Sequence, residues 1–159
     1  MEVVCKPSTE WSELECYYPR FNAMFPTGTT NADIRYISSI DNLKSCTWLD
    51  QITFANVMDL RCAEFIAQNP GKFPLLRGVV LSGHDICADK SLTVYGGLTK
   101  LPVLTMLGLE YCSECQIISP ISNIRELYLN ELSNEVRQQI TSSQWVEKWF
   151  PGCQDITWY

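Results

Sequence analysis

The segment LPVLTMLGLEYC, residues 101–112, aligns without a gap with the segment ISNIRELYLNEL, residues 121–132. Both segments follow the pattern L-x-x-L-x-x-L-x-L, with isoleucine allowed in place of leucine. The matching apolar residues are Leu101, Leu104, Leu107 and Leu109 in the first segment and Ile121, Ile124, Leu127 and Leu129 in the second. Adjacent copies of one pattern predict a chain built from internal repeats, each of which forms one structural unit.

Three further segments fit the same frame. They are IDNLKSCTW at residues 40–48, FPLLRGVVL at residues 73–81 and FPGCQDITW at residues 150–158. The copies therefore begin at residues 40, 73, 101, 121 and 150, at intervals of 20 to 33 residues. Several copies in order are poorly explained by a chance match of leucine-rich sequence, so they predict a repeat architecture over most of the chain.

The pattern resembles the leucine-rich repeat family, whose units run about 20 to 29 residues. The uneven intervals resemble the ribonuclease-inhibitor-like repeats of F-box proteins. The resemblance implies an α/β fold, a short solenoid of about five irregular repeats with parallel strands. We expect residues 40–159 to form the repeat array with a C-terminal cap, and residues 1–39 to form an N-terminal cap or extension. In each copy the L-x-L pair is expected to form a short strand with both apolar side chains pointing inward.

Two segments between the copies predict helices. Residues 54–68 carry apolar side chains at helical spacing and are followed by Asn-Pro-Gly at residues 69–71, which is a typical helix terminator. Residues 133–149 open with Ser133, a suitable N-cap residue. This second helix carries two tryptophans four residues apart, and we expect them to cover the end of the array, since terminal repeats need a cap. They are Trp145 and Trp149.

Composition and charge exclude several classes of partner. The chain has 159 residues, which suits one domain, and a formal net charge of -6. Its 12 Lys and Arg residues are scattered, so we expect no nucleic-acid partner, because phosphate contacts need a basic patch. No apolar run approaches the length of a membrane-spanning helix, and the first residues do not resemble a signal peptide. We therefore expect an intracellular protein of the cytoplasm or nucleus, with most of its 8 cysteines reduced.

The candidate site follows from strand geometry. Residues that flank each inward pair are expected on the opposite, concave face, which is the usual binding surface of a solenoid. In the first copy these residues are Ser45 and Thr47. Among the later copies, the expected partner-binding residues are Val80, Met106, Glu110, Glu126, Tyr128, Asn130, Asp155 and Tyr159. Aromatic and apolar side chains with carboxylates around them suit a protein or peptide partner that carries Lys or Arg.

The expected function is that of a non-catalytic adaptor or complex subunit. No Ser-His-Asp order, glycine-rich phosphate loop or pair of carboxylates at fixed helical spacing occurs in the sequence. The chain has 1 histidine, so an enzyme that needs a histidine base would depend on His84. We expect no catalytic residue, no metal and no cofactor.

One alternative function comes from a C-x-x-C motif formed by Cys112 and Cys115. Together with the hydrophobic run before it and Tyr111, the motif resembles the redox segment of thioredoxins, and this implies a thiol-disulfide oxidoreductase. The sequence departs from that family at Glu114, which replaces the usual proline and whose carboxylate would oppose formation of a thiolate. Within the repeat frame, Cys112 instead occupies a position that bonds the backbone of the turn.

The sequence also allows a metal site. Alignment of the repeats places His84 and Cys87 opposite Cys112 and Cys115 in neighbouring units. Equivalent positions on neighbouring strands lie about 4.8 Å apart, which would let four such ligands meet around zinc. The simpler interpretation is that the histidine is an exposed turn residue and the cysteines are turn or core thiols.

Overall fold

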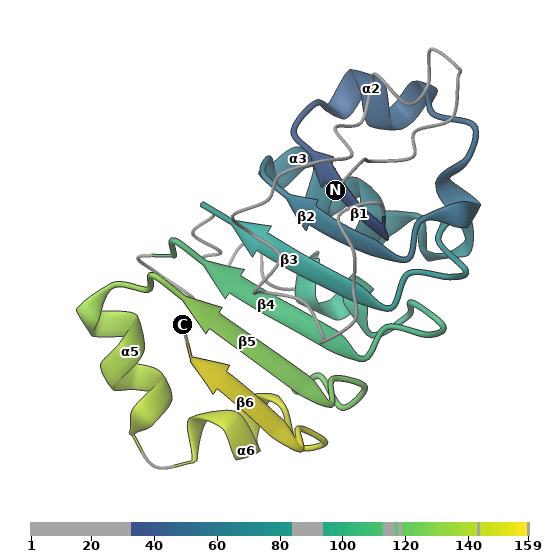
Figure 1. The fold of residues 1–159 in the computed structure, drawn as a ribbon. Coiled ribbons are helices and arrows are strands. Elements are labelled where there is room, and N and C mark those ends of the chain that lie inside the picture. Colours follow the sequence, from purple (N-terminus) through teal and green to yellow (C-terminus); the bar gives the residue numbers. More distant parts are fainter. Residues whose placement is uncertain (1–32, 84–93, 113–116, 118, 143, 159) are drawn as a thin grey trace.

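In the computed structural model, the residues described are 33–83, 94–112, 117, 119–142 and 144–158. These residues form one open sheet of six parallel strands in the order β1-β2-β3-β4-β5-β6 (Figure 1). The strands are β1 (Ile34–Ile37), β2 (Phe54–Val57), β3 (Gly78–Ser82), β4 (Met106–Glu110), β5 (Glu126–Asn130) and β6 (Asp155–Trp158). Each strand pairs with the strand that follows it in sequence, so the order never reverses. The prediction of an α/β fold with parallel strands is confirmed.

Four of the five sequence copies form the strands that their frame predicted. The first residues of the four L-x-L pairs lie in register across β3 to β6; they are Val79, Leu107, Leu127 and Ile156. The second residues are also in register; they are Leu81, Leu109, Leu129 and Trp158. All of these side chains are buried in β3, β4 and β5, whereas Ile156 and Trp158 of β6 are 43% and 37% exposed.

The prediction for the first copy, residues 40–48, is wrong. Residues Ile40–Ser45 form helix α2, and a short 3-10 helix, η3, spans Leu49–Gln51. The helix begins at Ser39, whose side chain accepts a hydrogen bond from the Asn42 N–H group at 3.3 Å. Apolar residues three positions apart fit a helix as well as the repeat frame. Ser45 and Thr47, which we expected on the first strand, therefore lie on no strand.

The first two strands lie where no strand was predicted. Strand β1 falls inside the segment that we expected to be an N-terminal cap, so the sheet begins before the predicted start of the array at residue 40. Strand β2 occupies the beginning of the predicted helix 54–68. The helix itself, α3, spans Leu60–Gln68, begins at the N-cap Asp59 and ends at Asn69, as its terminator predicted.

The predicted helix 133–149 forms two shorter helices, α5 (Asn134–Thr141) and α6 (Trp145–Trp149). Ser133 caps the first, accepting the N–H group of Val136 at 3.3 Å, as expected. Gln144, with a positive φ of 77°, separates the two helices. Trp145 is buried and its ring lies 5.6 Å from that of Phe150, so this tryptophan packs in the main core.

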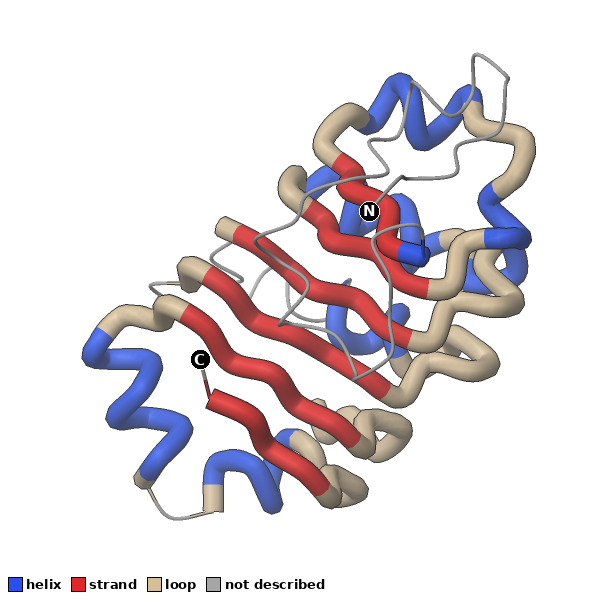
Figure 2. The backbone as a smooth tube through the Cα atoms, in the orientation of Figure 1, coloured by secondary structure: helices blue, strands red, loops and turns tan. Residues whose placement is uncertain are grey.

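The helices lie on one side of the sheet. The main hydrophobic core joins the inward side chains of the strands to apolar residues of α2, α3, the helical segment 94–98, α5 and α6. Figure 2 shows the strands as one continuous sheet whose near face carries no described helix. None of the described helices is both long and apolar enough to cross a membrane.

The backbone repeats the same arrangement at each entry into β3, β4, β5 and β6. One carbonyl of the preceding turn accepts two consecutive N–H groups of the next turn. Thr53 O accepts from Arg77 and Gly78, Arg77 O from Thr105 and Met106, Thr105 O from Arg125 and Glu126, and Arg125 O from Gln154 and Asp155. A second repetition follows β3, β4 and β5, where Gly83, Tyr111 and Glu131 all have positive φ, at 72°, 56° and 50°.

The positive φ at Glu131 gives a test of this repeated turn. A left-handed backbone costs a residue with a Cβ about 1 to 2 kcal/mol, a cost that glycine avoids. We expect Glu131→Gly to be more stable than Glu131→Ala by about 1 kcal/mol in urea unfolding. At the exposed helical residue Gln138, the order should be reversed, with glycine less stable than alanine by about 1 kcal/mol. A more stable alanine at residue 131 would contradict the left-handed turn.

Candidate functional site

The face of the sheet opposite the helices, which we call the strand face, carries a second hydrophobic cluster. Its members come from β1 to β5 and are Ile34, Tyr36, Phe54, Val80, Met106 and Tyr128, with Met58 packed against them. No residue of a described helix belongs to this cluster. The sheet therefore has apolar side chains on both faces, although the described helices cover only one.

Gly78 lets the two sides of this cluster meet across β3. A Cβ atom built on Gly78 would lie 2.5 Å from the sulfur of Met106 and 2.8 Å from Cδ1 of Phe54. The missing side chain is thus the space in which Phe54 and Met106 pack. The guanidinium of Arg77 lies 5.5 Å from the centre of the Phe54 ring and covers its edge of the cluster with a cation-π contact.

A row of polar side chains crosses the carboxyl ends of the strands on the same face. Ser82, Glu110 and Asn130 are register partners at the last positions of β3, β4 and β5. The Ser82 hydroxyl lies 2.8 Å from Oε1 of Glu110 and 2.8 Å from Oδ1 of Asn56, and the amide of Asn130 donates to Oε2 of Glu110 at 2.9 Å. Glu110 and Asn56 are completely buried, so this row runs through an apolar environment.

The hydrogen bonds within this row are incomplete. The Ser82 hydroxyl has one hydrogen and can donate to only one of its two neighbours, and the buried Asn56 amide nitrogen has no hydrogen-bond partner among the described residues. Turning the Asn56 amide around would let it donate to Ser82, which would then donate to Glu110, but would leave the Asn56 oxygen without a donor. Among the described residues Glu110 has no cationic partner. The row therefore has hydrogen-bonding capacity for a further acceptor in one orientation of the Asn56 amide, or for a further donor in the other.

The strand face brings together most of the partner-binding residues that the sequence predicted. Val80, Met106, Glu110 and Tyr128 all lie on it, as alternation along the strands implied, but they are only 0%, 1%, 0% and 8% exposed. They therefore share the predicted face of the sheet but are not open to solvent. Glu126 and Asn130 are half-buried, Asp155 is exposed, and Tyr159 lies outside the described residues.

Sequence reasoning missed the part of the strand face that β1 and β2 provide. The missed residues are Ile34, Tyr36, Phe54 and Asn56. Both strands are short and buried on both faces, so neither shows the alternation of polar and apolar residues that marks a strand with one exposed face. Only the β-branched and aromatic residues of IRYI could have indicated a strand.

The cysteines of the described segments lie in or against the main core. Cys112 is buried, and its S–H group points to the carbonyl of Glu110 at 3.6 Å, which agrees with a role in the turn. Burial raises the pKa of Cys62 to about 11 and also raises the pKa of Cys153. Such thiols are poor nucleophiles at neutral pH because the thiolate is the reactive form. Cys115, His84 and Cys87, which complete the redox and zinc alternatives, lie outside the described residues.

Metal ligation finds no support in the segments that are described. No group of three or more His, Cys, Asp or Glu side chains within them is arranged to hold a metal ion.

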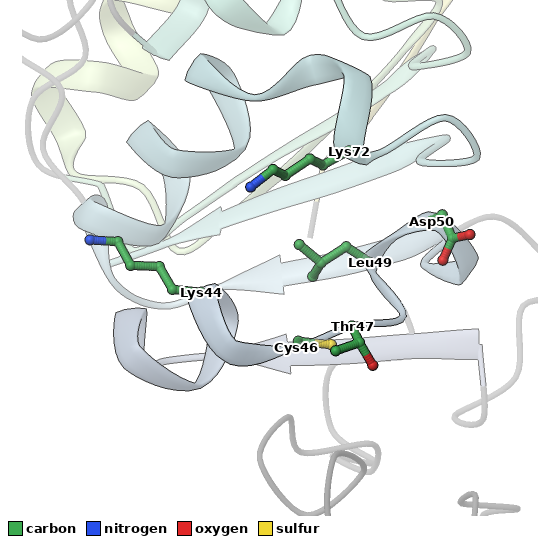
Figure 3. Close-up of a pocket in the computed structure, with 6 residues that line it drawn as sticks. All are labelled: Lys44, Cys46, Thr47, Leu49, Asp50 and Lys72. Carbon is green, nitrogen blue, oxygen red and sulfur yellow. The ribbon is translucent and has the colours of Figure 1, made fainter.

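A pocket of about 260 Å³ opens on the helical side of the molecule (Figure 3). It is lined by Lys44, Cys46, Thr47, Leu49, Asp50 and Lys72. In Figure 3 the two lysine side chains extend in one direction and Asp50 points away from them, so the charged groups do not converge. The Nζ atom of Lys72 instead lies 5.3 Å from the centre of the Phe65 ring. The strand face, with its polar row and apolar cluster, is the stronger candidate site.

No protein-family model, curated protein or solved structure matches this chain.

The contact across Gly78 can be tested by adding one methyl group. Gly78→Ala would place a Cβ atom against Met106 and Phe54, and we expect it to lower the free energy of unfolding by about 1 to 3 kcal/mol. Gly71→Ala is the matched control, because nothing lies within 4 Å of its Cβ position. A double-mutant cycle with Met106→Ala should recover part of the loss. Equal stability of the Gly78 and Gly71 variants in urea unfolding would contradict this packing.

Proposed function

We propose that this chain is a short solenoid of the leucine-rich-repeat type and works as a non-catalytic protein-interaction module, an adaptor or complex subunit. The sequential order of six parallel strands in the described residues supports the solenoid. So does the repeated carbonyl that accepts two N–H groups at each entry into β3 to β6. An open α/β sheet with helices on both faces would instead reverse its strand order.

The observation that carries the proposal is the second apolar cluster, on the strand face. A one-sided layer of helices needs an apolar core only beneath those helices. Phe54, Val80, Met106 and Tyr128 lie on the other face, where no described helix requires them. Apolar and aromatic side chains grouped on a face that the described helices leave uncovered are suited to anchor a partner, since such residues dominate the binding energy of interfaces.

The charges beside the cluster favour a basic protein or peptide. Glu126 of β5 and Asp155 of β6 are register partners, so two carboxylates stand side by side next to Tyr128. Like charges at directly paired positions are destabilising, and a lysine or arginine placed between them would relieve the repulsion. The buried Glu110 adds a third carboxylate on the same face. We propose a partner that presents Lys or Arg next to an apolar anchor.

The proposed setting is intracellular, in the cytoplasm or nucleus. Supporting this, the described cysteines Cys62 and Cys153 are free thiols. Free thiols persist in reducing compartments.

The test is affinity capture from a native extract with the full chain and two charge-reversal variants. Glu126→Lys with Asp155→Lys alters the acidic pair, whereas Glu64→Lys with Glu147→Lys makes the same charge change on helices α3 and α6. We expect the first variant to lose a specific partner by about tenfold, equivalent to about 1.4 kcal/mol. The second variant should retain that partner.

Two results would count against the proposal. Retention of the same partner by both variants would move the site away from the strand face. Failure of the unaltered chain to retain any protein above a bead-only control would remove the support for an interaction module.

A further inference from the structure

The last strand of the sheet, β6, has an open edge (Figure 1). Among the described residues β6 pairs only with β5, so one row of its backbone N–H and C=O groups has no strand beside it. The four residues of β6 are exposed or half-buried, whereas all four residues of β1, at the opposite edge of the sheet, are buried. An edge that presents unpaired backbone groups is a template for a further strand.

Two apolar side chains of β6 lack a neighbour on this open side. Ile156 and Trp158 are the register partners of Leu127 and Leu129. Both leucines are completely buried between β4 and β6, but Ile156 and Trp158 remain 43% and 37% exposed. The guanidinium of Arg137 lies 4.9 Å from the centre of the Trp158 ring and covers only part of it. A strand added beside β6 would bury both side chains if it carried apolar residues opposite them.

The backbone at the start of β6 continues the series of carbonyl acceptors described above. Arg77, Thr105 and Arg125 each donate an N–H group to the preceding turn and accept two N–H groups from the following one. Gln154 is the next member of the series, because its N–H group donates to Arg125 O at 2.8 Å. No N–H group of a described residue donates to Gln154 O. This carbonyl therefore lies where it can accept two consecutive N–H groups from a strand that runs parallel to β6.

The charges at this edge favour one kind of added strand. Asp155 is exposed, and its register partner on β5 is Glu126, a second carboxylate. In a parallel strand beside β6, the residue directly opposite Asp155 would lie on the strand face as well. Opposite charges at directly paired positions stabilise a sheet, and like charges destabilise it. A lysine or arginine opposite Asp155 is therefore favoured over an acidic residue.

We propose that β6 binds an extended segment of a partner protein as a further parallel strand, with the pattern Lys or Arg, apolar, any residue, apolar. The basic residue stands opposite Asp155, and the two apolar residues stand opposite Ile156 and Trp158. This recognition deepens the proposed function and rests on it, because it states how a partner with Lys or Arg beside an apolar anchor is held. Main-chain hydrogen bonds to an open edge give such complexes affinity, and alternate side chains give them specificity.

The charge pairing is tested with short synthetic peptides by fluorescence anisotropy. The probe is a fluorescein-labelled peptide of sequence Gly-Lys-Leu-Thr-Leu-Gly, and the matched peptide has Glu in place of Lys. We expect the unaltered chain to bind the lysine peptide about fivefold more tightly than the glutamate peptide. Asp155→Lys should reverse this preference, whereas Glu64→Lys on α3 should leave it unchanged. An unaltered preference in the Asp155→Lys variant would overturn the proposed pairing.

The backbone pairing has a readout that needs no protein variant. Successive N–H groups along a strand point to opposite edges, so the lysine N–H group of the peptide would donate to Gln154 O and that of the first leucine would point away from β6. A methyl group on the lysine backbone nitrogen should weaken binding about tenfold. A methyl group on the leucine nitrogen should weaken it much less. Equal binding of the two methylated peptides would overturn strand addition.

The capture experiment separates strand addition from the proposed function. Ile156→Lys with Trp158→Lys removes the apolar side of the edge and keeps both carboxylates, and circular dichroism checks that the sheet is intact. We expect this variant to lose the partner that is lost when the charges of Glu126 and Asp155 are reversed. Retention of that partner here, with loss only in the charge-reversal variant, would overturn strand addition and leave the proposed function in place. Peptide binding as expected, with no protein captured by the unaltered chain, would count against the proposed function alone.

A second copy of the chain is the other occupant that an open edge could take, and sedimentation of the chain alone distinguishes it. A monomer that binds the lysine peptide would support the proposal. A dimer that Ile156→Lys dissociates would assign the edge to a second copy and overturn the proposal.

Discussion

The hydrogen bonding between successive parallel strands is the constraint on which the rest of this structure depends. At each entry into β3, β4, β5 and β6, one turn carbonyl accepts two N–H groups of the next turn. This arrangement fixes the register, so that Leu107 stands beside Leu127 and Leu109 beside Leu129. A shift by one residue would move these leucines to the opposite face. The leucine spacing and the backbone pairing therefore specify the same alignment.

The strand face is a consequence of that register. When the L-x-L pairs point towards the helices, the residues between and beside them must point the other way. Gly78, with no side chain, then lies where Phe54 and Met106 approach each other across β3. Ser82 and Glu110 are brought within hydrogen-bond distance because they are paired at the ends of β3 and β4. The apolar cluster and the polar row thus follow from one alignment of strands.

The repeat frame predicted β3 to β6 because the spacing of its leucines indicates which side chains point inward. It could not predict β1 and β2, since IRYI and FANV are buried on both faces and show no alternation. It misplaced a strand at residues 40–48, where spacing three apart suited a helix capped by Ser39. For the site, alternation predicted which residues share the strand face. Their burial depends on what lies over the face, and periodicity along a strand does not encode that.

The burial of Glu110 is easier to explain if the strand face has a function than if it only stabilises the sheet. A leucine at this position would also bury its side chain and would avoid the desolvation of a carboxyl group, which is costly wherever its hydrogen bonds are incomplete. Two hydrogen bonds, from Ser82 and Asn130, offset only part of that cost. The stability of the sheet alone therefore gives no reason for a carboxylate beside Met106 and Val80. A donor or cation brought by an occupant of the face does give a reason, and this favours the strand face as a site of recognition over a second core.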